Sequence, residues 1–285
     1  MIESRGFSKE DGIFVPQRRL VHRNEEYEEA GFEVLLRMQR EHFWYVGRHR
    51  ILLRALRAEI EKRWTGKAGL RAIDMGGGCG GWLAFLHESG IEAFDNLALA
   101  DSSIEALKMA APVVGKFADR YQIDLLDLGW SEEWDAVFLL DVLEHIPDHA
   151  KALVEIRKSL RPGGMLFLTV PALNSFWTYS DDISKHQRRY CKRDIDSLAQ
   201  FAGFDVARTE YFMFFLSPAL LLSRLLHRPP SSATAEDLKE FVAGTHRVPP
   251  RPLNSLLSSI LSLEAALIDR ISFPWGTSLL AVLRR

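Results

Sequence analysis

Hydrophobic residues follow two different periods along the middle of the chain. Short apolar runs, of the kind that form buried strands, occur at 70–75, 96–101, near 121–124, and at 134–141, 165–170 and 204–212. Apolar residues at helical spacing lie between these runs, at 80–90, 103–110, 147–160 and 193–203. Strands that alternate with helices predict an α/β protein with a doubly wound, Rossmann-like sheet. Such a sheet binds ligands at the carboxyl ends of its strands.

The start of the chain departs from this alternation. Residues 1–23 show no clear period, and two helical patterns follow before the first strand. The first runs over 24–40, with Asn24 as its N-cap, and the second runs over 47–64. We therefore expect residues 1–65 to form an N-terminal helical lid.

The end of the chain also differs from the middle. Residues 214–275 contain two leucine-rich helical patterns separated by a polar stretch with several prolines. The second pattern starts at Asn254 and places apolar residues at helical spacing: Leu256, Ile260, Leu263, Leu267 and Ile271. The final residues, 276–285, predict one more strand, which pairs with 204–212. The expected core is thus 66–213 plus 276–285, with 214–275 as a helical insertion.

Composition narrows the class of protein. A chain of 285 residues suggests one domain with additions, and its net charge of −2 gives no indication of nucleic-acid binding. Two cysteines, Cys79 and Cys191, fit a reduced compartment and exclude a disulfide framework. No secretory signal is visible, and the apolar run at 211–223 is too short to span a bilayer. The expected location is the cytoplasm.

The stretch AIDMGGGCGG at 72–81 packs five glycines into six positions after an apolar run. Glycine allows backbone N–H groups to approach a ligand, and a helix that starts there favours negative charge. Gly76-x-Gly78-x-x-Gly81 matches the dinucleotide fingerprint, whereas Asp74 followed by alternating glycines matches a pattern for S-adenosylmethionine. Since the ammonium and sulfonium of S-adenosylmethionine are cationic, the Asp74 carboxylate favours that cofactor and would repel a pyrophosphate. Asp101, at the end of the second strand, can accept hydrogen bonds from ribose hydroxyls, or it can cap the next helix.

Two later segments are more specific than the glycine loop. Asp-Val-Leu-Glu-His-Ile-Pro-Asp at 141–148 follows the fourth strand, and Leu-Arg-Pro-Gly-Gly at 160–164 precedes the fifth. Together with 72–80 and 100–103, they resemble class I S-adenosylmethionine-dependent methyltransferases, in the order and spacing usual for that group. The likeness is to the small-molecule group that includes ubiquinone-biosynthesis O-methyltransferases. It implies a seven-stranded sheet with an antiparallel last strand, S-adenosylmethionine as cofactor and S-adenosylhomocysteine as product.

The resemblance also implies cofactor-binding residues. They lie along the first four core strands and in the helix before them: Asp74, Gly76, Gly78, Gly80, Asp101, Ser102, Asp124, Leu125, Leu140, Trp44 and Arg48. In this set Asp124 accepts a hydrogen bond from the adenine amine, although Asp is also common in strand-end turns. The segment His-Phe-Trp-Tyr-x-x-Arg at 42–48 resembles bacterial methyltransferases in which aromatic residues cover the cofactor, with Arg48 reaching its carboxylate. The alternative is that these aromatic residues belong to the core.

The implied reaction is an in-line displacement at the sulfonium methyl group, for which the enzyme mainly positions the acceptor atom. A hydroxyl or acidic-carbon acceptor must also lose a proton. Two histidines are candidates for the base: His145, after the fourth strand, and His186, in a loop after the fifth. A structural role in ordering its own loop is the alternative for His145.

The loop that contains His186 resembles a D-x-x-x-H-x-R-R-Y pattern of bacterial methyltransferases linked to glycan, lipid or secondary-metabolite clusters. Asp182, rather than Asp181, has the required spacing. The predicted substrate-binding residues lie in and before this loop: Trp177, Arg188, Arg189 and Tyr190. The two arginines can bind a carboxylate or phosphate of the acceptor, or pair with acidic residues of the loop. No metal site is predicted, since Cys79 has no second metal ligand nearby in the sequence.

These patterns predict an S-adenosylmethionine-dependent methyltransferase that acts on a small-molecule or a sugar- or lipid-linked acceptor, with oxygen as the favoured atom. The alternatives are N- or C-methylation of a secondary metabolite and a non-catalytic nucleoside-binding protein. Three interpretations of 214–275 stay open: a roof over the acceptor pocket, a homodimer interface, or contact with a membrane surface. No nucleic-acid partner is expected.

Overall fold

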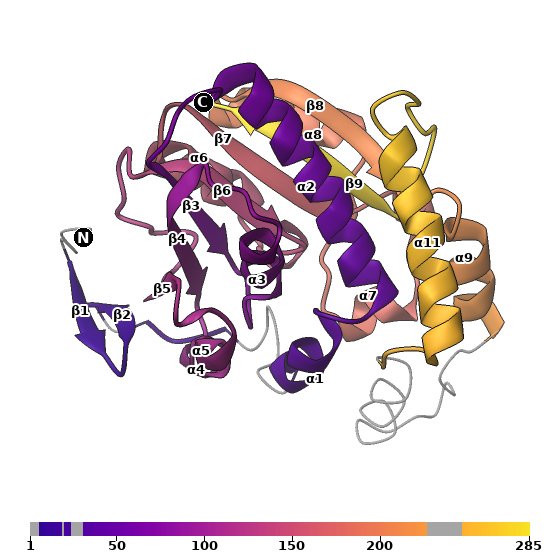
Figure 1. Cartoon of the computed structure of the whole chain (residues 1–285), viewed down its shortest axis with the longest axis horizontal. Helices are drawn as coiled ribbons and strands as arrows, with labels where there is room; N and C mark the ends of the chain where they lie inside the picture. Colours follow the sequence, from indigo (N-terminus) through magenta and orange to yellow (C-terminus); the bar gives the residue numbers. More distant parts are fainter. Residues whose placement is uncertain (1–5, 19, 24–30, 227–246) are drawn as a thin grey trace.

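The structure is a computed structural model that describes residues 6–18, 20–23, 31–226 and 247–285. Within these residues one sheet holds nine strands, in the order β1-β2-β5-β4-β3-β6-β7-β9-β8 (Figure 1). The strands are β1 (Phe7–Glu10), β2 (Ile13–Pro16), β3 (Leu70–Met75), β4 (Phe94–Asp101), β5 (Ala118–Gln122), β6 (Trp134–Leu140), β7 (Leu160–Pro171), β8 (Asp205–Phe212) and β9 (Ser278–Arg284).

Helices cover both faces of the sheet. The helices are α1 (Gly31–Met38), α2 (Phe43–Arg63), α3 (Gly81–Glu88), α4 (Ile104–Met109), α5 (Ala111–Val114), α6 (His149–Ser159), α7 (Tyr179–Ile183), α8 (Lys192–Ala202), α9 (Ser217–Leu226) and α11 (Arg251–Leu267), with 3-10 turns η1 (Leu143–His145) and η2 (Asn174–Phe176). On one face α2, α3 and α11 share a hydrophobic core with strand residues such as Phe138 and Phe167. On the other face α6 and α8 pack against Val137 and Leu166. Alternate residues of β6 and β7 thus point to opposite cores, as a sheet covered on both faces requires.

The strand order confirms the doubly wound architecture. β3 lies between β4 and β6 and is parallel to both, so the chain winds outward in two directions from this strand. The last strand, β9, runs antiparallel to both β7 and β8. Loops after β3 and β6 therefore leave the sheet on either side of a topological switch point, which is where open α/β sheets bind ligands.

The predicted count of seven strands was wrong, because a hairpin near the N-terminus adds two more. β1 and β2 pair antiparallel, and β2 continues the sheet beyond β5. Asp11 and Gly12 connect them, with φ angles of +47° and +77°. Positive φ at both turn residues matches the twist of a tight hairpin.

One predicted helix start differs from the structure, and another lies outside the described residues. The helix at 147–160 begins at His149, with the Asp148 side chain accepting a hydrogen bond from the Lys151 N–H, so Pro147 precedes the helix rather than lying in its first turn. Of the helix predicted over 24–40, the structure describes the part that forms α1. The predicted N-cap, Asn24, lies outside the described residues.

The predicted apolar side of the second insertion helix was right only in part, since Ile260 and Leu267 pack against the core but other predicted residues do not. α11 begins at Arg251, before Asn254, and Leu256 and Leu263 are 59% and 56% exposed. Its buried residues are Leu261, Glu264 and Ala265. The buried side of α11 thus includes the polar residue Glu264 and leaves out Leu256 and Leu263.

The Glu264 carboxylate accepts hydrogen bonds from the backbone N–H groups of Phe214 (3.1 Å) and Phe215 (3.2 Å). These groups follow Met213, which has a φ of +65°. Glu264 therefore joins α11 to the turn that follows β8.

The insertion packs closely on the helix that precedes the core. α2 and α11 lie side by side over the same face of the sheet (Figure 1). At their contact a Cβ atom on Gly47 would lie 2.3 Å from Leu261 Cδ1, so only glycine permits this approach. Asn254 accepts a hydrogen bond from the Phe43 N–H and donates one to the Glu41 carbonyl, at 2.9 and 2.8 Å. The insertion thus caps the start of α2 and fixes its position.

Candidate active site

A cavity of about 1020 Å³ opens at the carboxyl ends of the central strands. Residues 20–23, helices α1, α2 and α9, and the loops that follow β3, β4, β5, β6 and β7 all contribute to its lining. Segments far apart in the sequence therefore meet at the switch point of the sheet, where the ligand was expected.

The glycine loop forms one wall of this cavity. Gly76, Gly78 and Gly80 have φ angles of +71°, +55° and +81°, a region that other residues rarely adopt. Gly76 borders the cavity, whereas Gly78 and Gly80 are not among the lining residues. A Cβ atom on Gly78 would lie 2.7 Å from Leu35 Cδ2, because α1 lies directly against the loop. Gly78 and Gly80 thus shape the loop, and Gly76 faces the cavity.

Asp74 is the second-last residue of β3, directly before this loop, and is 1% exposed. Burial raises the pKa of Asp74 to about 7; the nearby Arg48 guanidinium counteracts this rise, and the Asp101 carboxylate adds to it. Within the described part of the chain, the Oδ1 atom of Asp74 has no hydrogen-bond partner. A carboxylate with an unbonded oxygen therefore lines the cavity.

Asp101 and Ser102 line the neighbouring part of the cavity. The Asp101 carboxylate accepts hydrogen bonds from the Gly78 N–H and the Ser103 N–H, both at 3.0 Å. Burial raises the pKa of Asp101, and these backbone hydrogen bonds oppose the rise. The cap on the next helix is Ser103, whose hydroxyl accepts from the Ala106 N–H, and Asp101 supports the same turn.

Asp124 and Leu125 follow β5 and also line the cavity. Asp124 accepts hydrogen bonds from the Leu126 N–H at 2.9 Å and from Arg23 at 2.8 Å. The sequence prediction did not include the segment that contains Arg23. His22, in the same segment, bonds through Nδ1 to the Ser102 hydroxyl at 2.8 Å. Nothing in the local sequence identifies residues 20–23 as site residues, because their position depends on the chain folding back over β4 and β5.

Trp44, Arg48 and Leu140 complete the predicted cofactor set, and all three line the cavity. The Arg48 guanidinium lies 5.0 Å from the Trp44 ring centre and pairs with the Asp141 carboxylate. Asp141 also accepts from the Thr169 hydroxyl at 3.1 Å and has a φ of +57°. In the described part of the chain Arg48 Nε has no hydrogen-bond partner. Phe43 belongs to the hydrophobic core and also lines the cavity, as Trp44 and Tyr45 do.

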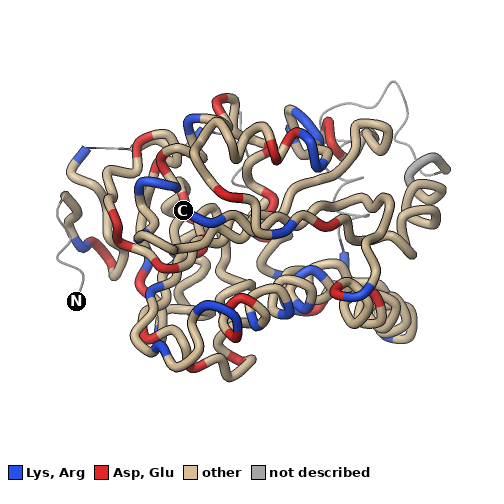
Figure 2. Tube along the Cα trace, turned by 90° about the horizontal axis from the view of Figure 1, so that it is seen from above, with Lys and Arg blue, Asp and Glu red and all other residues tan. Residues whose placement is uncertain are grey.

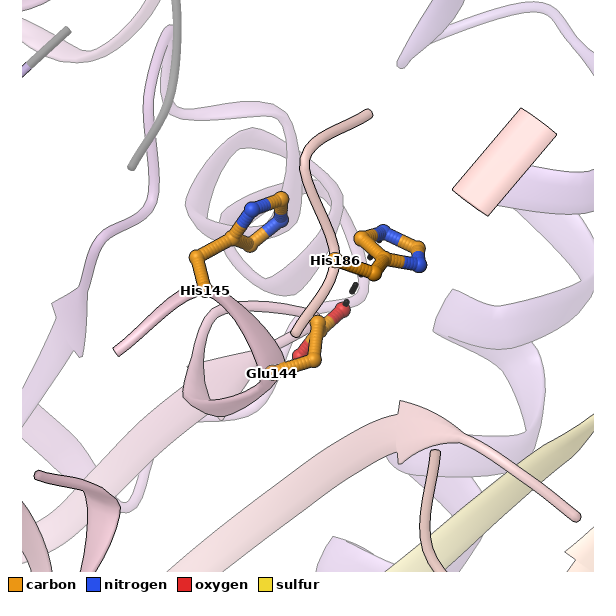
Figure 3. Close-up of side chains that lie close together, drawn as sticks. All are labelled: Glu144, His145 and His186. Atoms are coloured by element: carbon orange, nitrogen blue, oxygen red, sulfur yellow. Dashed lines mark ion pairs between the residues drawn. The ribbon is translucent and has the colours of Figure 1, made fainter. Parts of the chain in front are cut away.

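Glu144, His145 and His186 come together at the other end of the cavity (Figure 3). Glu144 and His145 project from η1, and His186 comes from the loop after β7. The two imidazole rings have centres 4.9 Å apart, and His186 Nε2 lies 3.9 Å from Glu144 Oε1. Burial and the Asp141 carboxylate raise the pKa of Glu144 well above its ordinary value, against the effect of Arg48 and Arg189. This cluster unites the two predicted base candidates with a carboxylate that was not predicted.

A network centred on Asp181 holds His186 and Arg189. Asp181 Oδ1 lies 2.9 Å from His186 Nδ1 and accepts from Arg189 Nε at 2.8 Å. Burial alone would raise the pKa of Asp181, but the hydrogen bonds from His186 and Arg189 outweigh burial and lower the pKa to about 2. The partner of His186 is thus Asp181 and not Asp182, which instead accepts from Trp177 Nε1 at 2.9 Å.

Three of the predicted substrate-binding residues do not line the cavity: Trp177, Arg188 and Tyr190. Arg188 donates to the backbone carbonyls of Ile146 and Pro147, and the Tyr190 hydroxyl donates to the Leu143 carbonyl.

Arg189 does line the cavity, but its guanidinium is engaged by Asp181 and by the carbonyls of Ala172 and Thr277. These interactions fit the structural alternative better, since they join the loop to α7, to the residue after β7 and to the residue before β9.

The insertion contributes apolar residues to the cavity: Leu220, Leu221 and Leu253. Basic and acidic residues alternate along the trace and do not collect on one side (Figure 2). Among the described residues, no helix combines the length and the apolar character needed to cross a bilayer.

Comparison with known proteins connects this geometry to a family. A family model described as a methyltransferase domain matches residues 46–209, more than half of the chain. A trans-aconitate 2-methyltransferase of Azoarcus sp. (strain BH72) is 33% identical over 99 residues, which cover 35% of this chain and 38% of that protein. A ubiquinone biosynthesis O-methyltransferase of Idiomarina loihiensis is 30% identical over 114 residues, which cover 39% of this chain and 46% of that protein. The matches thus span less than half the length of these curated relatives.

Solved structures show the same fold. A Haloferax volcanii protein described as a methyltransferase, in a complex with the Trm112 methyltransferase activator, has a TM-score of 0.57 at 19% identity and covers 93% of this chain and 98% of that chain. A Galdieria sulphuraria protein described as a sarcosine dimethylglycine methyltransferase has a TM-score of 0.52 at 16% identity and covers 80% of this chain and 83% of that chain. The family match, the strand order and the glycine loop together make this chain a member of the methyltransferase domain family, of the class I type that depends on S-adenosylmethionine.

Proposed function

We propose that this protein binds S-adenosylmethionine at the glycine-loop end of the cavity and transfers its methyl group to an oxygen atom of a small-molecule, sugar-linked or lipid-linked acceptor. The observation that carries the proposal is Asp74, whose buried Oδ1 has no hydrogen-bond partner among the described residues. A buried carboxylate is costly unless a charge or hydrogen bond compensates it. S-adenosylmethionine offers both, through its ammonium and its sulfonium.

The remaining cofactor residues support the same placement. Asp101 and Ser102 lie where a ribose would follow the glycine loop, and Asp124 and Leu125 lie one strand further, where adenine would extend. Each oxygen of an ionised carboxylate has two lone pairs, so Asp101 can accept ribose hydroxyls besides its backbone hydrogen bonds. Arg48 has an Nε atom available for the carboxylate of the methyl donor.

The acceptor would occupy the end of the cavity beside Glu144, His145 and His186. In-line transfer requires the acceptor oxygen close to the methyl carbon and opposite the sulfur. A hydroxyl gains nucleophilicity as its proton leaves, and this cluster supplies the groups that favour that loss. Positioning and deprotonation are the two contributions that the protein makes to the reaction.

The body of the acceptor would pack under the insertion. Leu220, Leu221 and Leu253 face the cavity, which supports the interpretation of 214–275 as a roof over an acceptor with an apolar portion. Because α11 is joined to α2 and to the turn after β8, this roof is attached to the same core that holds the cofactor residues.

Calorimetry with S-adenosylmethionine and S-adenosylhomocysteine tests the cofactor site. We expect both to bind the wild-type chain and Asp74→Asn to weaken the methyl donor at least tenfold, while Asp182→Asn, with its carboxylate bonded to Trp177, serves as the matched control. Transfer of a labelled methyl group to pooled hydroxyl compounds then tests catalysis. Binding without transfer to any pool would favour the non-catalytic alternative, and failure of the wild-type chain to bind S-adenosylmethionine would refute the proposal.

A further inference from the structure

Glu144 is a buried carboxylate that the protein itself does not neutralise. It is fully buried, and neither of its oxygens has a hydrogen-bond partner among the described residues. The two nearest guanidinium groups are already paired: Arg189 donates to both oxygens of Asp181, and Arg48 pairs with Asp141. A carboxylate removed from water in this way is costly unless another positive group lies against it.

His186 presents an imidazole nitrogen to this carboxylate. Its Nδ1 lies 2.9 Å from Asp181 Oδ1, and Asp181 accepts from Arg189 and from the Thr178 N–H as well. A carboxylate held this way accepts a proton donor, so Nδ1 carries the hydrogen and Nε2 keeps its lone pair. The carboxylate–histidine pair is the arrangement that orients histidine ligands towards a metal ion.

Two lone-pair atoms therefore face each other with nothing from the described chain between them. Glu144 Oε1 and His186 Nε2 are 3.9 Å apart, which is too long for a direct hydrogen bond. Ligand atoms bound at about 2.1 Å lie about 3.4 Å apart in a tetrahedral site and about 4.2 Å apart when opposite. One ligand atom from each of Glu144, His145 and His186 lies within 4.8 Å of the others (Figure 3). Shifts of less than about 1 Å for each ligand atom would bring all three to bonding distance.

We infer that Glu144, His145 and His186 bind a divalent transition-metal ion at the acceptor end of the cavity. One carboxylate and two imidazoles form a donor set that suits Zn²⁺ and its first-row neighbours. Three protein ligands leave a coordination position open, and all three residues line the cavity. A hydroxyl oxygen bound at that position would have its pKa lowered, which is a route to the deprotonation that methyl transfer needs. This last consequence rests on the proposed function, whereas metal binding does not.

Titration of the full chain with Co²⁺, after removal of bound metal by a chelator, tests the inference. We expect one equivalent to bind with visible absorption bands that imidazole coordination produces, and Zn²⁺ to displace it. Glu144→Gln and His186→Gln should each bind Co²⁺ at least tenfold more weakly, while His87→Gln, in the exposed part of α3, should bind as the wild type does. A thermal shift on adding Co²⁺ should occur in the wild type and be lost in the first two variants.

The binding of S-adenosylmethionine provides the folding control, since the glycine-loop end of the cavity is not altered by these substitutions. Variants that bind the methyl donor normally but not Co²⁺ support the metal site. Absence of stoichiometric Co²⁺ binding by the wild type, or equal binding by Glu144→Gln and His186→Gln, overturns it. Co²⁺ binding is measured without the methyl donor, so its failure is distinct from a failure of the proposed function.

Discussion

The burial of Asp74 makes binding of the methyl donor depend on pH in a direction that can be calculated. Burial, opposed by Arg48 and assisted by Asp101, raises the pKa of Asp74 to about 7. The ammonium of the methyl donor is attracted to the ionised carboxylate and not to the neutral acid. The affinity should therefore rise as pH increases through the acidic range.

The magnitude follows from the ionised fraction of Asp74. With a pKa of about 7, roughly 3% of the carboxylate is ionised at pH 5.5 and roughly half at pH 7. If only the ionised form binds, affinity increases about 15-fold between these values. The range stays below the pKa of an α-amino group, near 7.7–8.0, so the ammonium of the methyl donor remains charged throughout.

Isothermal titration calorimetry at four pH values between pH 5.5 and 7, at constant ionic strength, measures this slope. Asp74→Asn should bind weakly with an affinity that changes little with pH, and Asp182→Asn should keep the wild-type slope. A wild-type affinity that is constant over this range, or a slope that persists in Asp74→Asn, would refute the argument that the ionised Asp74 carboxylate holds the ammonium.

The stability of the unliganded protein should show the opposite trend. The folded pKa of Asp74 lies above the ordinary value of 3.8, so the folded protein retains a proton that the unfolded chain has lost. The free energy of unfolding contributed by this group therefore falls as pH rises from about 4 to about 7, by about 4 kcal/mol in total. Urea unfolding of the wild type and Asp74→Asn across this range should give a shallower pH dependence in the variant.

Four other substitutions test three separate parts of the structure: the glycine loop, the turn after β8 and the loop that holds His186. Gly78→Val should abolish binding of the methyl donor, because Gly78 has a positive φ and lies against α1. Gly81→Ala displaces only the Gln39 side chain, so this variant should still bind the methyl donor in calorimetry. Glu264→Ala leaves two backbone N–H groups without an acceptor and should lower the free energy of unfolding by about 3 kcal/mol in urea; an unchanged midpoint would contradict this. Asp181→Asn should reduce kcat about tenfold or more without changing affinity for the methyl donor, and an equal loss in both would indicate general unfolding.

The order of strands and helices in the core was predictable because burial on both faces leaves a simple pattern. β3 and β6 are mainly apolar and almost wholly buried, and the glycine loop follows β3 directly. The N-terminal hairpin was missed although Asp11-Gly12 is a hairpin signal, since its flanking strands are short and β1 is mostly exposed. The buried side of α11 was predicted only in part because Glu264 is polar, and only the tertiary structure shows that two backbone N–H groups donate to its carboxylate.

The cofactor residues were more predictable than the acceptor residues, for a physical reason. Asp74 and Asp101 lie at the carboxyl ends of β3 and β4, and Asp124 follows β5, so the topology alone brings them to one edge of the sheet. The direction of a side chain in a long loop depends on tertiary contacts: Arg188 turns towards the backbone carbonyls beside η1. The pairing of His186 with Asp181 depends on which residue the capping box of α7 turns inward.

The hairpin that extends the sheet also determines where the sheet ends. Without β1 and β2, the outer strand would be β5, and its backbone groups on that side would be open to pairing with another chain. The aromatic ring of Phe14 stacks on Tyr121 at 4.7 Å and covers the apolar surface beside this edge. With the hairpin in place, the outer strand is β1 instead of β5. β1 has four residues, of which Ser8, Lys9 and Glu10 are exposed. A short, charged outer strand disfavours sheet extension by another chain, so the hairpin of β1 and β2 shields this edge of the sheet.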